Sequence, residues 1–229
     1  MFSHRNPVKR NRNIGTKKAG CKRQSEFRLP DQNYQPFYEN IKIQSCCRRT
    51  INGKDYHFVI EKLKSGYTYT CSVDEICEVL SHCPAGDLDG LSLIILRQPK
   101  KKEEIFSCCW GRIQYFFEYN GKVQPAIIIE AINLSKDIVH KKSALSSFHK
   151  KELQLLPTEG HELIEGKRTI TIKTSFQSAK NTQLYRTLLH EVGHYVFYKS
   201  DNYVDTYEEK ELYANNYAKK IRDSIMTAK

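Results

Sequence analysis

The segment His190-Glu191-Val192-Gly193-His194 holds two imidazoles four residues apart, with a carboxylate directly after the first. Residues four apart lie on one face of an α-helix, so both imidazoles can reach the same metal ion. This spacing is typical of zinc, which imidazole nitrogens bind at about 2.0 to 2.1 Å, and it leaves the glutamate beside the open coordination position. The segment therefore predicts a zinc site with His190 and His194 as ligands and Glu191 as the catalytic base.

A catalytic zinc ion usually takes a third protein ligand and keeps its fourth position for water. Glu211 satisfies the geometry, because five residues lead from His194 to an expected helix end near Lys199, and five lead from Thr206 to Glu211. At roughly 1.5 Å per residue, each path measures about 7.5 Å, so a second helix that folds back antiparallel brings Glu211 level with His194. Glu208, one turn earlier on a nearby face, is the competing ligand.

Two helices are expected to position these residues. The first has an apolar face formed by Tyr185, Leu188, Leu189, Val192 and Val196. That face must pack into the core, and both histidines lie off it. Asn181 can cap the start of this helix, and Ser200-Asp201-Asn202 can end it. Thr206 followed three residues later by Glu209 is a capping box, which opens a second helix that runs to about Ile225.

The chain before these helices is expected to be rich in sheet over residues 50–135. Tyr56–Ile60 and Tyr67–Cys71 alternate in polarity around a Lys-Ser-Gly turn, which predicts one hairpin. Ile113–Tyr119 and Ala126–Ile132 flank an Asn-Gly pair, which predicts a second hairpin.

Other local patterns predict the remaining elements ahead of the two helices. Leu91–Arg97 reads as a compact apolar strand, and Ser72 with Glu75 forms a capping box that predicts a short helix. The segment Lys136–Leu156 is expected to be helical, and His161–Lys173 is expected to form short strands.

The first thirty residues carry most of the positive charge of the chain. They hold nine Lys and Arg against one acid, which contributes +8 of the net +11. We therefore expect residues 1–30 to be a basic, disordered tail ahead of a single domain over residues 31–229. Two roles stay open for this tail: a solvated terminus, or an arm that binds nucleic acid or another polyanion.

The apolar runs and the cysteines indicate in which cellular compartment the protein is expected. No run approaches the roughly 18 to 20 apolar residues of a membrane span, and the basic terminus has no apolar segment of the kind a secretory signal needs. We expect a cytoplasmic protein without membrane contact, whose eight cysteines stay reduced. Since no Cys-x-x-Cys pair occurs, buried thiols are favoured over a second metal site or a redox role.

His190–His194, followed by Glu211-Leu212-Tyr213-Ala214-Asn215-Asn216-Tyr217-Ala218, resembles the gluzincin metallopeptidases. The second motif is similar to the Glu-x-x-Ala-Asn-x-aromatic-Ala signature of the ImmA/IrrE-like group. The resemblance covers residues 181–220. It implies an α+β, zincin-like fold, with a small, mostly antiparallel sheet packed on an active-site helix and a second ligand-bearing helix. The two catalytic helices would span residues 181–225.

The resemblance also implies a chemistry. Zn²⁺ would be held by His190, His194 and Glu211, and Glu191 would activate the zinc-bound water for hydrolysis of peptide bonds in a protein or peptide substrate. The alternative is a catalytically idle, zincin-like binding module that docks on nucleic acid through its basic arm. Glu191 favours the enzyme, because a purely structural metal site has no need of it.

Supporting roles are less specific. An edge strand, for which Ala126–Ile132 is the candidate, could hold a peptide substrate by strand addition. Candidates for stabilising an oxyanion, with packing as the simpler role for each, are Tyr213, Tyr217 and His161. Candidates for orienting a ligand histidine through its second nitrogen are Asn215, Asp201 and Asp205. Gly193 and Ala214 are small enough to let the two helices approach closely.

Overall fold

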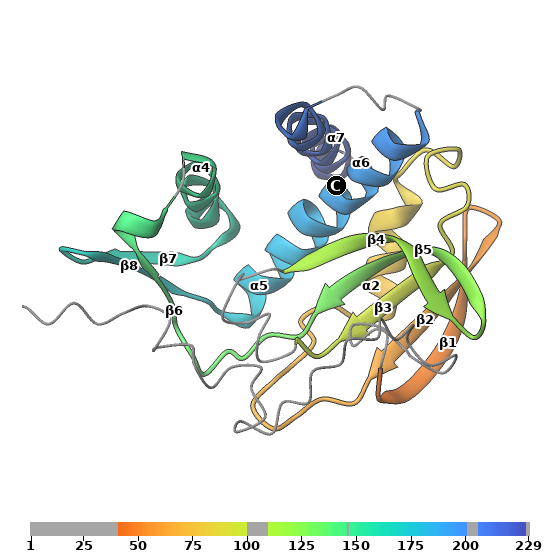
Figure 1. The fold of residues 1–229 in the computed structure, drawn as a ribbon, viewed down its shortest axis with the longest axis horizontal. Coiled ribbons are helices and arrows are strands. Elements are labelled where there is room, and N and C mark those ends of the chain that lie inside the picture. The colour runs from red at the N-terminus through yellow and green to blue at the C-terminus, as the bar shows by residue number, and fades with distance from the viewer. Residues whose placement is uncertain (1–40, 100–109, 146, 201–205, 228–229) are drawn as a thin grey trace, which may run out of the picture. The chain divides into compact units, whose positions relative to one another are not determined.

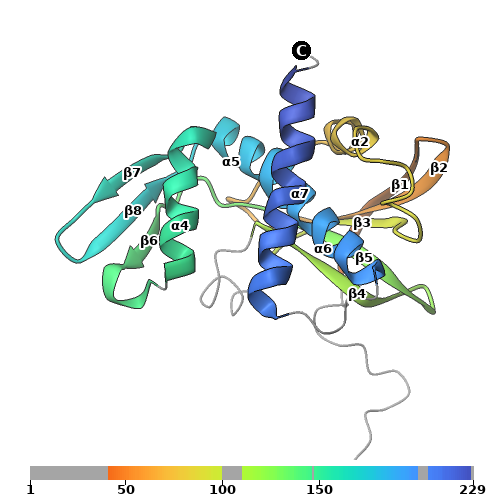
Figure 2. The same cartoon turned by 90° about the horizontal axis from the view of Figure 1, so that it is seen from above.

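The computed structural model describes residues 41–99, 110–145, 147–200 and 206–227. It is an α+β arrangement of a five-stranded mixed sheet, a three-stranded sheet, and a long helical stretch packed against a C-terminal helix (Figures 1 and 2). The strands are β1 (Ile43–Ile51), β2 (Lys54–Glu61), β3 (Leu93–Arg97), β4 (Gly111–Tyr119), β5 (Lys122–Glu130), β6 (Ile138–Lys141), β7 (Glu162–Glu165) and β8 (Thr169–Lys173).

The helices fall into two groups. The α-helices are α2 (Val73–Ser81), α4 (Ser147–Leu155), α5 (Phe176–Thr182), α6 (Leu189–Lys199) and α7 (Tyr207–Thr227). Shorter elements are the 3₁₀-helices η2 (Lys142–Ala144) and η3 (Leu156–Glu159) and the π-helical segment η4 (Gln183–Leu188). Because α5, η4 and α6 follow one another without a break, they form a single helical stretch over residues 176–199.

The large sheet has the strand order β1-β2-β3-β5-β4, with β2, β3 and β5 parallel and β1 and β4 antiparallel at its edges. The expectation of a mostly antiparallel sheet is therefore wrong for this sheet. The physical reason lies in the central strands, since a strand buried on both faces reads as a continuous apolar run. Leu-Ile-Ile-Leu in β3 and Ala-Ile-Ile-Ile in β5 are such runs, and all eight residues are buried.

The hairpin at Asn120-Gly121 is confirmed, since β4 and β5 pair across it and both turn residues have positive φ, 52° and 72°. The hairpin that was expected to pair Tyr56–Ile60 with Tyr67–Cys71 is wrong. β2 pairs with β1 around Asn52-Gly53, where φ is 49° and 77°. Asn-Gly adopts these left-handed conformations at little cost, so it outcompetes a Lys-Ser-Gly turn.

The segment Tyr67–Cys71 has one bridge to the sheet region instead, between Thr68 and Ile132. Ala126–Ile132 is also not an edge, because β5 lies between β3 and β4. The edge strand nearest the helices that carry the candidate site is β4, which contacts α6. This correction matters for any substrate that binds by strand addition.

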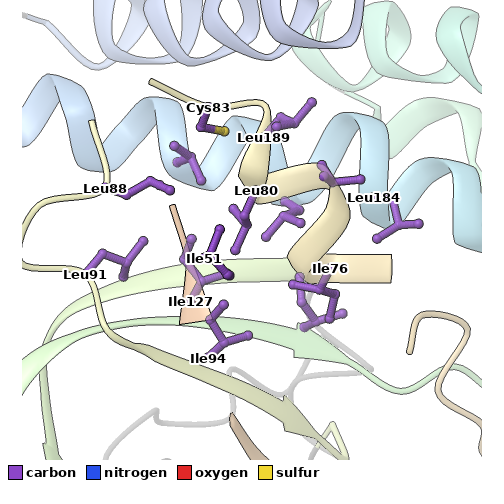
Figure 3. Packing of buried hydrophobic residues seen from close by; sticks show 14 of the residues in the cluster. Ile51, Ile76, Leu80, Cys83, Leu88, Leu91, Ile94, Ile127, Leu184 and Leu189 are labelled. Carbon is purple, nitrogen blue, oxygen red and sulfur yellow. The ribbon is translucent and has the colours of Figure 1, made fainter. Parts of the chain in front are cut away.

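The main core lies between the large sheet and the helices. Figure 3 shows Ile76 and Leu80 of α2 packed between Ile94 of the sheet and Leu189 of the long helical stretch. All four side chains are fully buried. The capping box of α2 is confirmed, because the Ser72 hydroxyl accepts from the Glu75 backbone and the Glu75 carboxylate accepts from the Ser72 backbone. A second, smaller cluster, which includes Val59, Leu93, Ile95 and Ile128, lies on the other face of the sheet.

The helix expected over Lys136–Leu156 is only partly present. Residues 138–141 form β6, which pairs with β8, while helix α4 begins at Ser147. The short strands expected within His161–Lys173 are confirmed as β7 and β8. β6, β7 and β8 form the second sheet, with a small core of its own around Leu153, Leu156 and Ile172.

The boundaries of the helical stretch differ from the expectation at one end. Ser175, not Asn181, caps it, through a capping box with Ser178. Asn181 lies inside α5, where its amide donates to the Glu159 carbonyl. α7 begins with the expected capping box, because the Thr206 hydroxyl accepts from the Glu209 backbone and the Glu209 carboxylate accepts from the Thr206 backbone.

The basic tail, residues 1–30, and Asp201 and Asp205 lie outside the described residues, so the predictions that rest on them stay predictions. In the part of the chain that the structure describes, no helix is both long enough and apolar enough to cross a membrane.

Candidate metal centre

The two helices that carry the predicted ligands meet at a pair of small residues. A Cβ atom added to Gly193 would lie 2.8 Å from the Cα atom and 3.0 Å from the carbonyl oxygen of Ala214. The apolar face of α6 points into the core through Leu189 and Val192, both fully buried. Its other face is thereby turned toward α7. The expectation that Gly193 and Ala214 keep the helices close is confirmed.

His190, His194 and Glu211 come together between these helices. The Nε2 atom of His190 lies 3.4 Å from Oε2 of Glu211, and Nε2 of His194 lies 3.4 Å from Oε1 of the same carboxylate. One ligand atom from each residue lies within 4.8 Å of the others. The three side chains are 14 to 16% exposed, so they are largely shielded from solvent but remain reachable.

The donor set fits a metal ion. Donors bound to a tetrahedral zinc ion at about 2.0 to 2.1 Å lie about 3.3 to 3.4 Å apart, and each histidine lies 3.4 Å from one of the two oxygens of Glu211. Two imidazoles and a carboxylate are also ligands that zinc accepts. Among the described residues, no other three His, Cys, Asp or Glu side chains have ligand atoms that all lie within 4.8 Å of one another. The group His190, His194 and Glu211 can therefore hold a metal ion.

Asn215 orients one of the histidines. Its Oδ1 atom lies 3.0 Å from Nδ1 of His190. With the side-chain oxygen of Asn215 as acceptor, the proton of the neutral imidazole stays on Nδ1, and Nε2 keeps its lone pair for a metal. Asn215 lies one turn after Glu211 on α7, so one helix supplies both a candidate ligand and the group that orients another.

Glu191 lies beside the group but does not belong to it. Its side chain is buried, and its Oε2 atom accepts a hydrogen bond of 2.8 Å from the backbone N–H of Ile113 in β4. Burial raises the pKa of Glu191, while His190, His194 and this N–H act in the opposite direction. The carboxylate is thus fixed by the edge strand and is more basic than an exposed glutamate.

The charges within the group are strongly coupled. Burial alone would raise the pKa of Glu211, but its hydrogen bonds with His190 and His194 outweigh burial and hold its pKa well below the usual range. Burial alone would lower the pKa of His190, but Glu211 and Glu191 outweigh it and raise that pKa. The carboxylate therefore stays ionised, as a metal ligand must be.

The rival carboxylates lie elsewhere. Glu209 is engaged in the cap of α7 with Thr206, as its spacing predicted. Glu208 is exposed on the first turn of α7, and it is not a member of the metal-binding group.

The three candidates for the oxyanion role have other contacts. The Tyr217 hydroxyl donates to Asp87 at 2.9 Å, and the Tyr213 ring packs against Phe197. His161 forms hydrogen bonds with Thr174 and Thr182, at 3.2 and 2.8 Å. Each side chain has a packing or structural partner, which was the simpler expectation.

Two tyrosines near the group were not anticipated. Partial desolvation and the nearby Glu211 carboxylate raise the pKa of Tyr207. Its position four residues before Glu211, on the same helix face, is a signal that the sequence contains. The Tyr115 hydroxyl donates to the His194 carbonyl at 3.4 Å, and its ring stacks on Tyr198 at 4.3 Å. This contact between β4 and α6 depends on the tertiary fold.

Comparisons of the chain with protein-family models, with curated proteins and with solved structures found no match.

Proposed function

We propose that this protein is a zinc-dependent peptidase that hydrolyses peptide bonds in a protein or peptide substrate. His190, His194 and Glu211 would hold the zinc ion, and Glu191 would be the catalytic base. The observation that carries the proposal is a buried carboxylate, Glu191, fixed next to a group of three metal-binding side chains on two helices. When bound, zinc would lower the pKa of a coordinated water toward about 7 and polarise the scissile carbonyl.

The resemblance to gluzincins of the ImmA/IrrE-like group supports the same assignment. Within the resembling segment Glu211–Ala218, Asn215 contacts His190 and Ala214 makes the close helix contact. These positions have physical roles at the metal centre, so the resemblance extends beyond the ligands themselves.

Glu191 has the properties that a general base needs. It takes the proton from the attacking water and delivers it to the leaving amine, and a group that does both works best when its pKa lies near the operating pH. Burial raises the pKa of Glu191, which favours proton uptake, and the N–H of Ile113 holds one carboxylate oxygen in place. Because the other oxygen is not used by that bond, it remains available for the proton.

The edge strand β4 is the proposed binding surface for the substrate backbone. Its Ile113 N–H contacts Glu191, so a peptide that adds as a further strand beside β4 would run past the catalytic base. β4 has an irregularity in its pairing between Gln114 and Phe117. Phe116, in this irregular part, is 68% exposed and lies edge-on to Tyr198. An apolar substrate side chain fits this end of the strand.

The alternative, an idle binding module that docks on nucleic acid through residues 1–30, is less well supported. Burying a carboxylate has a free-energy cost, and a site that only binds metal has no use for Glu191 at this position. The placement of Glu191 therefore favours catalysis.

The experiment is cleavage of a mixed peptide library, followed by mass spectrometry. Glu191→Gln keeps the size and the hydrogen bond from Ile113 but cannot take up a proton, so it should retain zinc and lose at least about 10⁴-fold in rate. Glu208→Gln, an exposed glutamate, is the matched control and should cleave like the wild type. If the wild type with bound zinc cleaves nothing, or if Glu191→Gln cleaves equally well, the proposed function is wrong.

A further inference from the structure

A cavity of about 350 Å³ opens far from the metal centre, at the other end of strand β4. Its walls come from β1, from the start of β2, from Ser92 and from the β4–β5 hairpin. Tyr119 lines the cavity, while Ile113, six residues earlier on the same strand, contacts Glu191 beside the metal centre. At roughly 3.3 Å per residue, this separation is about 20 Å. The volume falls within the range of roughly 300 to 1,000 Å³ typical of small-molecule sites.

The cavity also lies on the opposite face of the sheet. Along β2, Phe58 packs into the core under the helices and Val59 packs into the cluster on the other face. Since neighbouring side chains of a strand alternate between faces, His57 shares the face of Val59. The cavity is therefore independent of the proposed peptidase site.

Three basic side chains line the cavity: Arg48, His57 and Lys122. They form no side-chain hydrogen bond or ion pair with any residue that the structure describes. Asp55 is the acid among the lining residues, and one of its oxygens accepts from the Thr50 hydroxyl at 2.8 Å. With two fixed cations against one carboxylate, the wall carries a net positive charge before His57 is counted.

The remaining wall supplies neutral groups and rings. The Ser92 hydroxyl donates to Oε1 of Gln124 at 3.3 Å, which leaves the amide nitrogen of Gln124 as a further donor. The rings of His57 and Tyr119 meet edge to face, with centroids 5.4 Å apart. Their arrangement gives one side of the cavity an aromatic surface beside the cationic groups.

We propose that this cavity binds a phosphate-bearing ligand of mononucleotide size, either free or as one unit of a nucleic-acid strand. The guanidinium of Arg48 presents paired N–H donors that match phosphate oxygens, and Lys122 adds a point charge. The aromatic surface at Tyr119 suits a base, since stacking on a ring tolerates any nucleobase. A carboxylate alone would leave part of this donor set unused.

The test is calorimetric titration of the full chain with inorganic phosphate, adenosine monophosphate and a short single-stranded trinucleotide. The double variant Arg48→Gln/Lys122→Gln removes both fixed cations, and the two side chains are exposed, so folding should persist and can be checked by circular dichroism. Arg49→Gln is the matched control. It lies next to Arg48 on β1, but its guanidinium pairs with Asp74 at 3.0 Å.

The double variant should bind adenosine monophosphate at least about tenfold more weakly than the wild type, because two charge-assisted contacts are lost. Arg49→Gln should bind within about twofold of the wild type. A response to the trinucleotide alone, weakened in the double variant, supports the site and identifies a strand as the source of the nucleotide. The proposal is overturned if none of the three ligands binds the wild type, or if the double variant binds them as tightly.

Discussion

Replacing Gly193 by alanine tests whether the close contact of α6 and α7 holds the metal-binding group together. The new Cβ would lie 2.8 and 3.0 Å from two backbone atoms of Ala214, and 3.1 Å from Cβ of Tyr217. Because the nearest atoms belong to backbone, a side-chain rotation cannot relieve the contact. Non-bonded carbon atoms are favourably placed at about 3.5 Å or more, so α7 must move away from α6 by roughly 0.7 Å at this point.

This displacement affects stability and metal binding by different amounts. Overpacking destabilises the fold by about 1 to 3 kcal/mol, and the higher helix propensity of alanine offsets about 1 kcal/mol of this. The net loss of folding free energy is therefore small. A shift of roughly 0.7 Å, in contrast, exceeds the tolerance of about 0.2 Å in metal–ligand distances. Since Glu211 lies on α7 and both histidines lie on α6, zinc affinity should fall by at least about tenfold.

The assay is zinc titration against a chromophoric chelator, with thermal unfolding measured in parallel. Gly86→Ala is the matched control, because a Cβ at Gly86 would meet no atom within 4 Å. It should change neither zinc affinity nor the melting temperature appreciably. Zinc affinity of Gly193→Ala within about twofold of the wild type would refute the reasoning from helix contact.

Two further predictions concern the residue that orients His190 and the buried thiols. Asn215→Ala removes the acceptor for Nδ1 of His190, so zinc affinity should fall about 10 to 100-fold by the same titration, while the exposed neighbour Asn216→Ala should leave it unchanged. Equal affinities in the two variants would contradict the orienting role. Burial raises the pKa of the Cys71 and Cys83 thiols to about 12, so both stay protonated at pH 8 and should resist iodoacetamide in the folded protein, whereas exposed Cys46 reacts. Peptide mapping by mass spectrometry measures this, and labelling of Cys71 as fast as Cys46 would speak against the buried environment.

The parts of the fold that follow from local chemistry could be predicted. The capping boxes at Ser72 and Thr206 depend on residues three positions apart, and the Asn120-Gly121 turn depends on two neighbours. The closeness of His194 and Glu211 could also be predicted from the sequence. His194 lies about five residues before the end of one helix, and Glu211 lies about five residues after the start of the next. The structure brings these two side chains within 3.4 Å.

The order of the strands could not be predicted in the same way. β2 and β3 pair in parallel although 31 residues separate Glu61 from Leu93, and no turn sequence encodes such a pairing. β6 lies within the segment Lys136–Leu156, for which the sequence predicts a helix, but its pairing with β8 decides its conformation. The hydrogen bond between Ile113 and Glu191 likewise depends on a strand and a helix far apart in the chain.

Zinc content of purified Glu211→Ala and Glu208→Ala, measured against the wild type by elemental analysis, tests the metal centre most directly. Both glutamates lie in the first turns of α7, but only Glu211 lies within 3.4 Å of the histidine nitrogens. The wild type and Glu208→Ala should each hold about one zinc ion per chain, and Glu211→Ala should lose most of it. Full zinc occupancy in Glu211→Ala, or loss of zinc only in Glu208→Ala, would contradict the assignment.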